Sequence, residues 1–170
     1  MSGPKRAMTR LQKELKTIRE LQTKGEETGW SAGPVNEADL FKWEGFLFGP
    51  EKSPFEGGMF KIRIEFTSEY PIKPPRVVFL TVPFHPNVYD NGNICLDILK
   101  DQWTPALQID QLLQSIRSLL TDPNPNSPAN GDAARMYTQN RPAYDAKVRQ
   151  QIAISNGSSS STASTLSRNL

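Results

Sequence analysis

Residues 85–103 read HPNVYDNGNICLDILKDQW, and this stretch holds both the only histidine and the only cysteine of the chain. Turn-forming residues bound and interrupt it: Pro83, Pro86, Asn91-Gly92 and Thr104-Pro105. Because proline fixes φ and Asn-Gly favours a tight reversal, the backbone here is expected to be irregular but constrained. A thiol placed by such a loop is a stronger candidate for chemistry than one inside a periodic apolar run. Cys95 is therefore the first candidate for a reactive residue.

The composition narrows the classes of protein to which the chain can belong. Its 170 residues suffice for one domain with a hydrophobic core. With 20 basic and 18 acidic residues the net charge is only +2, which argues against direct nucleic-acid binding. One cysteine cannot form an internal disulfide, and no hydrophobic leader opens the chain. A reducing intracellular location, in the cytoplasm, the nucleus or both, is expected.

Three further classes of partner are not expected. Apolar runs such as residues 77–84 are much shorter than a membrane span. Zinc usually takes three or four histidine, cysteine or carboxylate ligands, and a chain with a single histidine is not expected to form such a site. No Gly-x-x-x-x-Gly-Lys motif is present, so a directly bound nucleotide has no support.

The N-terminal segment has the pattern of an amphipathic helix over residues 4–22. Its apolar residues recur at three- and four-residue steps: Met8, Leu11, Leu15, Ile18 and Leu21. Through residue 24 it carries seven basic and two acidic residues. The basic surplus is either a solvated helix face or a docking face for an acidic partner.

Strand patterns follow this helix without helices between them. Residues 40–48 are rich in aromatics, residues 60–66 alternate strictly between apolar and charged, and residues 77–80 are β-branched or apolar. Short turns separate these segments, which favours an antiparallel meander and an α+β fold. Helices are expected after the cysteine loop, over residues 109–120, 129–138 and 142–154. The Ser/Thr-rich residues 155–170 are expected to be a disordered tail after a domain spanning residues 1–154.

The surroundings of Cys95 leave its role open at this point. An isolated cysteine is often a small buried hydrophobe, but Asn87 supplies an amide donor nearby in sequence, and Asp97 a carboxylate. His85 is the one candidate for a general base, although it fits a structural imidazole better. A thiol without a basic partner is poor at hydrolysis but can still exchange thioesters, because an acyl thioester is already activated.

Several motifs in order resemble the ubiquitin-conjugating enzyme family over about residues 5–152. They are Tyr70-Pro71 with Pro74-Pro75, Val78-Phe79, His85-Pro86-Asn87, Cys95, Trp103-Thr104-Pro105 and the turn at residues 122–125. The cysteine lies eight residues past the asparagine, and the tryptophan eight past the cysteine. The resemblance implies an α+β fold with an N-terminal helix, a four-stranded antiparallel meander, an active-site loop and then three helices.

The resemblance also implies roles for individual residues. Cys95 accepts ubiquitin as a thioester from the activating enzyme and passes it to a substrate lysine. Asn87 either holds the loop or donates to the oxyanion, and Asp97 helps the lysine lose its proton. Supporting positions in the active-site loops are His85, Asn124 and Ser127, with His85 structural.

The implied partners are ubiquitin, its activating enzyme, ubiquitin ligases of RING or HECT type, and lysine-bearing protein substrates. No cofactor is expected to bind directly, since ATP is consumed by the upstream activating enzyme. The surfaces implied are Arg6, Arg10 and Lys13 for the activating enzyme, Ile72, Pro105 and Ala106 for ligases, and Ser31 for a second, weakly bound ubiquitin.

Other interpretations remain at this stage. The family also includes conjugators of SUMO and of NEDD8, but the absence of an insertion between Cys95 and Trp103 favours ubiquitin. A cysteine hydrolase would use Cys95 with His85. A non-catalytic ubiquitin-binding adaptor, or an α+β domain in which the thiol only packs, would need no reactive cysteine.

Overall fold

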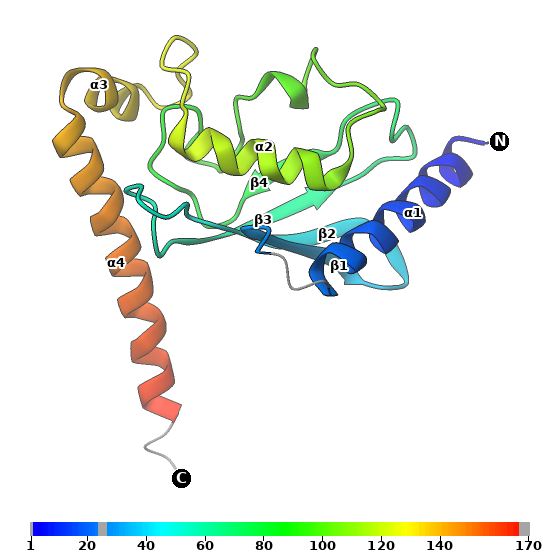
Figure 1. The fold of residues 1–170 in the computed structure, drawn as a ribbon, viewed down its shortest axis with the longest axis horizontal. Coiled ribbons are helices and arrows are strands. Elements are labelled where there is room, and N and C mark those ends of the chain that lie inside the picture. Colours follow the sequence, from blue (N-terminus) through cyan, green and yellow to red (C-terminus); the bar gives the residue numbers. More distant parts are fainter. Residues whose placement is uncertain (1, 24–26, 167–170) are drawn as a thin grey trace.

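The computed structural model describes residues 2–23 and 27–166, with side chains described as far as residue 157. Among these residues, helix α1 (Gly3–Thr23) precedes four strands, β1 (Trp30–Asn36), β2 (Asp39–Phe48), β3 (Met59–Glu65) and β4 (Arg76–Phe79). Helices α2 (Ile109–Thr121), α3 (Gly131–Gln139) and α4 (Arg141–Leu166) follow. The strands pair in the order β1-β2-β3-β4, and each pair is antiparallel (Figure 1). The α+β meander expected from the sequence is confirmed.

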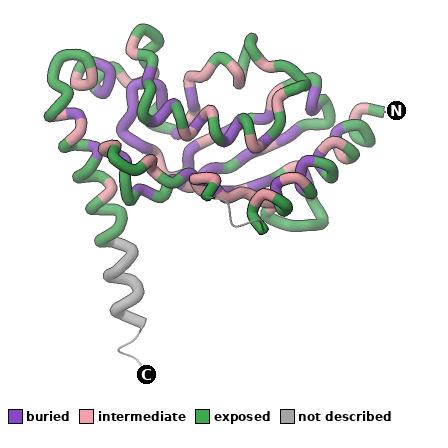
Figure 2. Tube along the Cα trace, in the orientation of Figure 1, coloured by how far each residue is buried: buried purple, intermediate pink, exposed green. Residues whose placement is uncertain are grey.

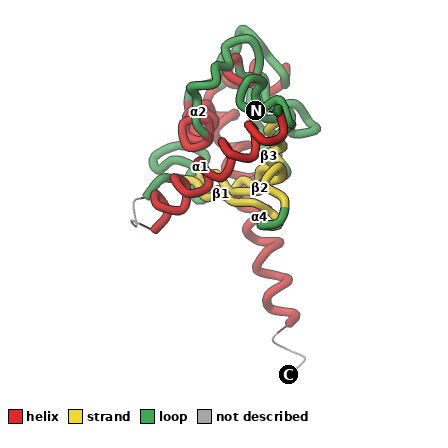
Figure 3. The backbone as a smooth tube through the Cα atoms, turned by 90° about the vertical axis from the view of Figure 1, so that its right-hand side faces the viewer, coloured by secondary structure: helices red, strands yellow, loops and turns green. Residues whose placement is uncertain are grey.

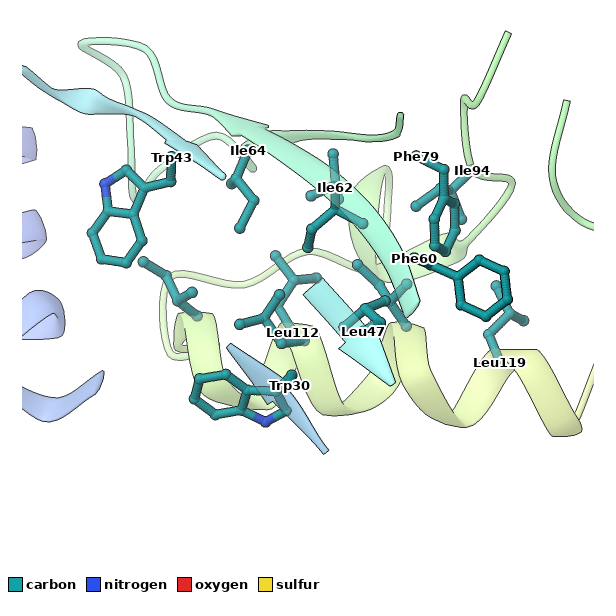
Figure 4. Packing of buried hydrophobic residues seen from close by; sticks show 14 of the residues in the cluster. Trp30, Trp43, Leu47, Phe60, Ile62, Ile64, Phe79, Ile94, Leu112 and Leu119 are labelled. Atoms are coloured by element: carbon teal, nitrogen blue, oxygen red, sulfur yellow. The ribbon is translucent and has the colours of Figure 1, made fainter. Parts of the chain in front are cut away.

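The hydrophobic core lies between the sheet and α2. The alternation in β3 directs Phe60, Ile62 and Ile64 inward, while Arg63 on the other face is exposed. On α2 the buried residues recur at helical spacing: Ile109, Leu112, Leu113, Ile116, Leu119 and Leu120. Figure 4 shows Leu112 and Leu119 of α2 facing the strand side chains, and Figure 3 shows α2 lying to one side of the sheet.

Helix α1 packs beside β1 and β2, as its apolar spacing predicts. Its inward face is the purple stripe along the helix in Figure 2, and it includes Leu11, Leu15 and Ile18. Burying aliphatic side chains of this size stabilises the fold by about 1.5–3 kcal/mol each. Helix α1 is therefore held by apolar contacts along its inner face.

A charged residue on this inner face joins α1 to α2. Glu14 is 4% exposed. It accepts a hydrogen bond from the Tyr70 hydroxyl, and its Oε1 accepts one from the backbone N–H of Ile109 at 2.7 Å. The Arg10 Nε lies 3.2 Å from Glu14 Oε2. Burial raises the pKa of Glu14 above its usual value, and the hydrogen bonds from Tyr70, Ile109 and Arg10 oppose that rise.

The last two helices differ from the expected ranges. Helix α3 begins at Gly131 and not at residue 129, because the Asn130 side chain caps it by accepting the N–H of Ala133 at 3.1 Å. Helix α4 runs to Leu166, whereas helix was expected only to residue 154. Elongating an existing helix costs little per residue, and serine and threonine lower helix propensity without breaking a helix as proline does.

Helix α4 covers residues 155–166 of the expected tail, and the disorder of residues 155–170 stays a prediction. Residues 167–170 lie outside the described residues. The helix passes the expected domain boundary without a break, and the division after residue 154 stays a prediction.

Replacing Glu14 with alanine is expected to lower the free energy of unfolding by about 3 kcal/mol, because it leaves buried donors on Tyr70 and Ile109 unpaired. Urea unfolding at pH 7 measures the change. Glu20→Ala is the matched control, because Glu20 is an exposed carboxylate on the same helix; its effect is expected to stay within about 0.5 kcal/mol. Equal, small losses in both variants would show that the Glu14 contacts do not join the two helices.

Candidate active site

Cys95 lies in the long irregular segment between β4 and α2, and its side chain is partly exposed. An isolated β-bridge between Val88 and Ile94 folds this segment back on itself, and a second one between Val78 and Asn93 joins it to β4. The Cys95 N–H donates to the carbonyl of Asn87 at 2.8 Å. The thiol is therefore attached to a backbone position that a hydrogen bond fixes. The loop thus holds the thiol in place, as the turn-forming residues indicate.

The turn before the cysteine depends on a glycine. Gly92 has φ +88°, in the left-handed region that glycine adopts without strain. A Cβ at this position would lie 2.0 Å from the carbonyl oxygen of Phe79, which is a steric clash. The Gly92 carbonyl in turn accepts the N–H of Phe79 at 2.9 Å. The close approach of the loop to β4 therefore requires glycine here.

His85 is fully buried and has both ring nitrogens engaged. Its Nδ1 accepts the N–H of Asn87 at 2.9 Å, so the proton of the neutral ring is on Nε2, which donates to the Leu119 carbonyl at 2.6 Å. Burial lowers the pKa of His85 to about 4, and contacts with the backbone of Leu119 and Leu120 offset this only in part. The ring therefore has no free nitrogen to take a proton from Cys95. The geometry favours a structural role and argues against a hydrolase built on these two residues.

Asn87 joins the cysteine loop to the loop before α3. Its Nδ2 donates to the carbonyls of Asn124 at 2.6 Å and Ser127 at 3.1 Å. Its Oδ1 accepts the N–H of Asn124 at 2.7 Å. Both amide hydrogens are thus used by backbone carbonyls. Of the two roles expected for Asn87, this arrangement favours holding the loops together, and donation to an oxyanion requires one of these bonds to be exchanged.

Asp97, Asn124 and Ser127 are exposed at the surface. Asp97 begins a short 3-10 turn, Asp97–Leu99, two residues past the cysteine, and its backbone carbonyl accepts the N–H of Lys100 at 2.9 Å. Its carboxylate is accessible to an incoming amine. Ser127 contributes its carbonyl to the Asn87 amide, which leaves the serine side chain on the surface.

One side chain near the thiol was not predicted from the sequence as a site residue. The Nζ of Lys100 lies 4.0 Å from the Sγ of Cys95. The sequence does indicate that the two residues could be close, since Lys100 follows Cys95 by five residues in a segment of short turns. The register of the 3-10 turn, which decides where the side chain points, is not readable from the residue pattern.

The basic residues assigned to α1 divide into two groups. Arg6 and Lys13 are exposed. Arg10, in contrast, donates to the carbonyls of Pro105 at 2.7 Å and Leu107 at 2.9 Å, in addition to its contact with Glu14. Arg10 is therefore partly engaged within the chain, and its assignment to the activating-enzyme surface stays a prediction. Its guanidinium fixes the loop before α2, and long-range contacts of this kind leave no trace in the helix pattern.

The residues assigned to the ligase surface are exposed on two loops that the structure brings together. Ile72 is 57% exposed, and Pro105 and Ala106 are also exposed. The Trp103 indole N–H donates to the carbonyl of Pro71 at 2.8 Å and so joins the two loops. Ser31, assigned to a second ubiquitin, is half-buried on β1 and pairs with Phe46 of β2.

Two kinds of feature are absent from the described residues. No group of three or more histidine, cysteine, aspartate or glutamate side chains in residues 2–23 and 27–166 has an arrangement suited to a metal ion. In the same part of the chain, no helix combines the length and the apolar character needed to cross a membrane.

Comparison with known proteins places this chain in a family. Residues 10–152 match a family model described as ubiquitin-conjugating enzyme. A curated relative from Caenorhabditis elegans, named ubiquitin-conjugating enzyme E2 1, is 46% identical over 152 residues, which cover 89% of this chain and 76% of the relative. The family match spans both loops joined by Asn87 and all four strands.

The depressed pKa of His85 predicts acid sensitivity. The unfolded chain binds a proton near pH 6.5 and the folded chain only near pH 4, so between these values the unfolded state binds more protons. Stability therefore falls as the pH drops, by about 2 kcal/mol between pH 7 and pH 5. Urea unfolding at a series of pH values measures this slope.

His85→Gln serves as the comparison, since it removes the only histidine but keeps Glu14, whose raised pKa gives a slope of opposite sign. The variant is expected to lose the acid-dependent decline in this range. The same slope in both proteins would mean that His85 is not buried in its neutral form.

Proposed function

Because the chain belongs to the ubiquitin-conjugating enzyme family, we propose that it accepts ubiquitin as a thioester on Cys95 and transfers it to lysine side chains of other proteins. Family membership makes the chain a ubiquitin transferase with ubiquitin, an activating enzyme and ligases as partners in general. The residue that carries the acyl group, the modifier and the kind of ligase are parts of the proposal.

The observation that carries the proposal is the contrast between Cys95 and His85. The thiol is partly exposed on a hydrogen-bonded loop, whereas the only imidazole is buried with both nitrogens engaged. Transthiolation needs a competent thiolate and an activated acyl donor, but no base that activates water. A site of this composition suits a carrier of acyl groups better than a hydrolase.

In the transfer step, the attacking amine must lose a proton and the thioester carbonyl develops negative charge. We assign the first task to the exposed carboxylate of Asp97. For the second task we assign the Asn87 amide, which holds the cysteine loop to residues 124–127 and becomes a free donor when one of its carbonyl contacts is exchanged. Asn124 and Ser127 then shape the approach of the lysine.

The partner surfaces follow from exposure and charge. Arg6, Arg10 and Lys13 on α1 are proposed to meet an acidic surface of the activating enzyme, with Arg6 and Lys13 the fully exposed members. Ile72, Pro105 and Ala106 form an apolar patch on loops joined by the Trp103–Pro71 hydrogen bond, a suitable surface for RING or HECT ligases. Ser31 is proposed to contact a second ubiquitin on the sheet.

Ubiquitin is proposed as the modifier in preference to SUMO or NEDD8. The relative from Caenorhabditis elegans bears a ubiquitin-conjugating name, and the segment between Cys95 and Trp103 has no insertion. ATP is proposed to be used only by the activating enzyme, and action in the cytoplasm, the nucleus or both fits a chain whose one cysteine is a free thiol.

The test is a charging assay with ubiquitin, its activating enzyme and Mg-ATP. An adduct of one ubiquitin that disappears with thiol reductant is expected, together with its absence in Cys95→Ala. Cys95→Ser is expected to form an adduct that resists reductant, because an oxyester replaces the thioester. Parallel reactions with SUMO and NEDD8 and their own activating enzymes identify the modifier. If no reductant-labile adduct forms with any of the three, the carrier function is wrong and a non-catalytic ubiquitin-binding role takes its place.

A further inference from the structure

The start of α3 is bonded to the cysteine loop through a single carbonyl. The Pro86 carbonyl accepts the N–H groups of Ala129 at 2.8 Å and Asn130 at 3.1 Å. The carbonyl of the next residue, Asn87, accepts the Cys95 N–H at 2.8 Å. Two consecutive carbonyls thus connect the residue that caps α3 with the residue that carries the thiol. A displacement at the start of α3 is therefore transmitted to the backbone that holds Asn87 and Cys95.

Asn130 belongs both to the helix and to this connection. Its side-chain Oδ1 accepts the N–H of Ala133 at 3.1 Å, and its carbonyl accepts the N–H of Ala134 at 3.0 Å, so Asn130 caps α3. Both alanines are buried. The N–H of Asn130 itself donates outside the helix, to Pro86. The side chain therefore fixes Asn130 on a packed helix, and the backbone N–H fixes the cysteine loop on Asn130.

The loop that precedes Asn130 is the one to which Asn87 is bonded, and it is the yellow loop between α2 and α3 in Figure 1. Residues 126–128 of this loop are exposed. The Asn87 side chain holds the loop at residues 124 and 127, and the Pro86 carbonyl holds it at residues 129 and 130. When the Asn87 amide exchanges a carbonyl contact for an oxyanion, the first attachment weakens. The second attachment then has to keep the loop in place.

We propose that Asn130 is a positioning residue for the transfer of the acyl group from Cys95 to lysine. The inference rests on the proposed thioester function. By capping α3 and donating to the Pro86 carbonyl, Asn130 holds the loop of residues 124–129 in register while the Asn87 amide turns toward the oxyanion. Asn130 thus acts on the reaction through Asn87, which is the group assigned to the developing negative charge.

The expected size of the effect follows from the alignment of the donor. An oxyanion donor stabilises the transition state only when it is aimed at the position that the charge will occupy. A misplacement of about 1 Å, caused by a change away from the reacting atoms, can slow a reaction by about a hundredfold. Removing the Asn130 side chain leaves the Asn87 amide present but less well held, so a loss of about tenfold is expected.

The test is the discharge of the thioester to free lysine. The parent chain carries Lys100→Arg, which replaces the amine 4.0 Å from the Cys95 Sγ. Each chain is charged with ubiquitin to completion, ATP is removed, lysine is added, and loss of the thioester is followed on non-reducing gels. Asn130→Ala is expected to charge to the same final fraction as the parent and to discharge about tenfold more slowly. Asn130→Asp, which keeps a capping oxygen, is expected to discharge like the parent.

Two further variants separate positioning from helix stability. Asn140 precedes α4, and its Oδ1 accepts the N–H of Ala143 at 3.3 Å, but its own N–H donates to Met136 within α3. Asn140→Ala therefore removes a cap of the same kind without touching the cysteine loop, and it is expected to discharge like the parent. Asn130→Gly is the converse, because glycine at a helix start costs little stability but has no side chain to fix the loop. It is expected to be as slow as Asn130→Ala.

Action through Asn87 has its own readout. In a chain with Asn87→Ala, the addition of Asn130→Ala is expected to slow discharge no further, because both changes affect the same donor. The proposal is overturned if Asn130→Ala or Asn130→Gly discharges like the parent, or if Asn140→Ala loses as much as Asn130→Ala. It is also overturned if Asn130→Ala slows discharge by the same factor with and without Asn87. Failure of the parent to form any thioester is a separate result on the non-reducing gel, and it overturns the carrier function together with this inference.

Discussion

The position of the candidate acceptor thiol depends on two buried polar side chains that precede it, His85 and Asn87. His85 connects the start of the cysteine loop to the last turn of α2 through the Leu119 carbonyl. Asn87 connects the same loop to residues 124–127, and its carbonyl accepts the Cys95 N–H. Buried polar groups are costly unless they are hydrogen-bonded. Among the described residues no buried side-chain nitrogen or oxygen lacks a partner. The hydrogen bonds of His85 and Asn87 therefore satisfy their buried polar atoms and restrict the conformations of the loop.

This constraint has a chemical consequence. The contacts that fix the loop use the lone pair and the proton of the only imidazole, so His85 cannot act as a base for the thiol. Cysteine hydrolases depend on a base of that kind, whereas an acyl carrier gains from its absence, because water is then not activated beside the thioester. The groups that remain near the thiol in the chain are an exposed carboxylate at Asp97 and an amine at Lys100. An exposed carboxylate can take the proton that an attacking amine must lose.

A similar constraint operates at the other end of the domain. Glu14 and Arg10 join α1 to Tyr70, to the first turn of α2 and to the loop that carries Pro105. The surfaces proposed for the activating enzyme and for ligases are thus parts of one hydrogen-bonded unit. A change at the buried carboxylate is expected to reach both surfaces through the backbone, without altering an exposed residue of either.

The sequence allowed the elements with a clear period to be predicted. The alternation in β3 and the helical spacing in α1 and α2 appear in the structure with the expected faces buried. For β1 no range was assigned, because Gly33 and Pro34 obscure its pattern. The candidate site was predictable where a turn or a motif marks it, as at Cys95 and His85. The contacts of Arg10 and Lys100 could not be predicted. Those of Arg10 depend on a loop far away in the sequence, and that of Lys100 depends on the register of a single turn.

The most direct test of a carrier site without a base is the fate of the loaded thioester. Lys100→Arg protein charged with ubiquitin and then freed of ATP is divided between buffer alone and buffer with free lysine, and loss of the thioester is followed on non-reducing gels. Slow loss in buffer and rapid loss with lysine, with ubiquitin recovered as the lysine amide, is the predicted result. Rapid loss in buffer to free ubiquitin, with no acceleration by lysine, would show that the site activates water and that Cys95 belongs to a hydrolase.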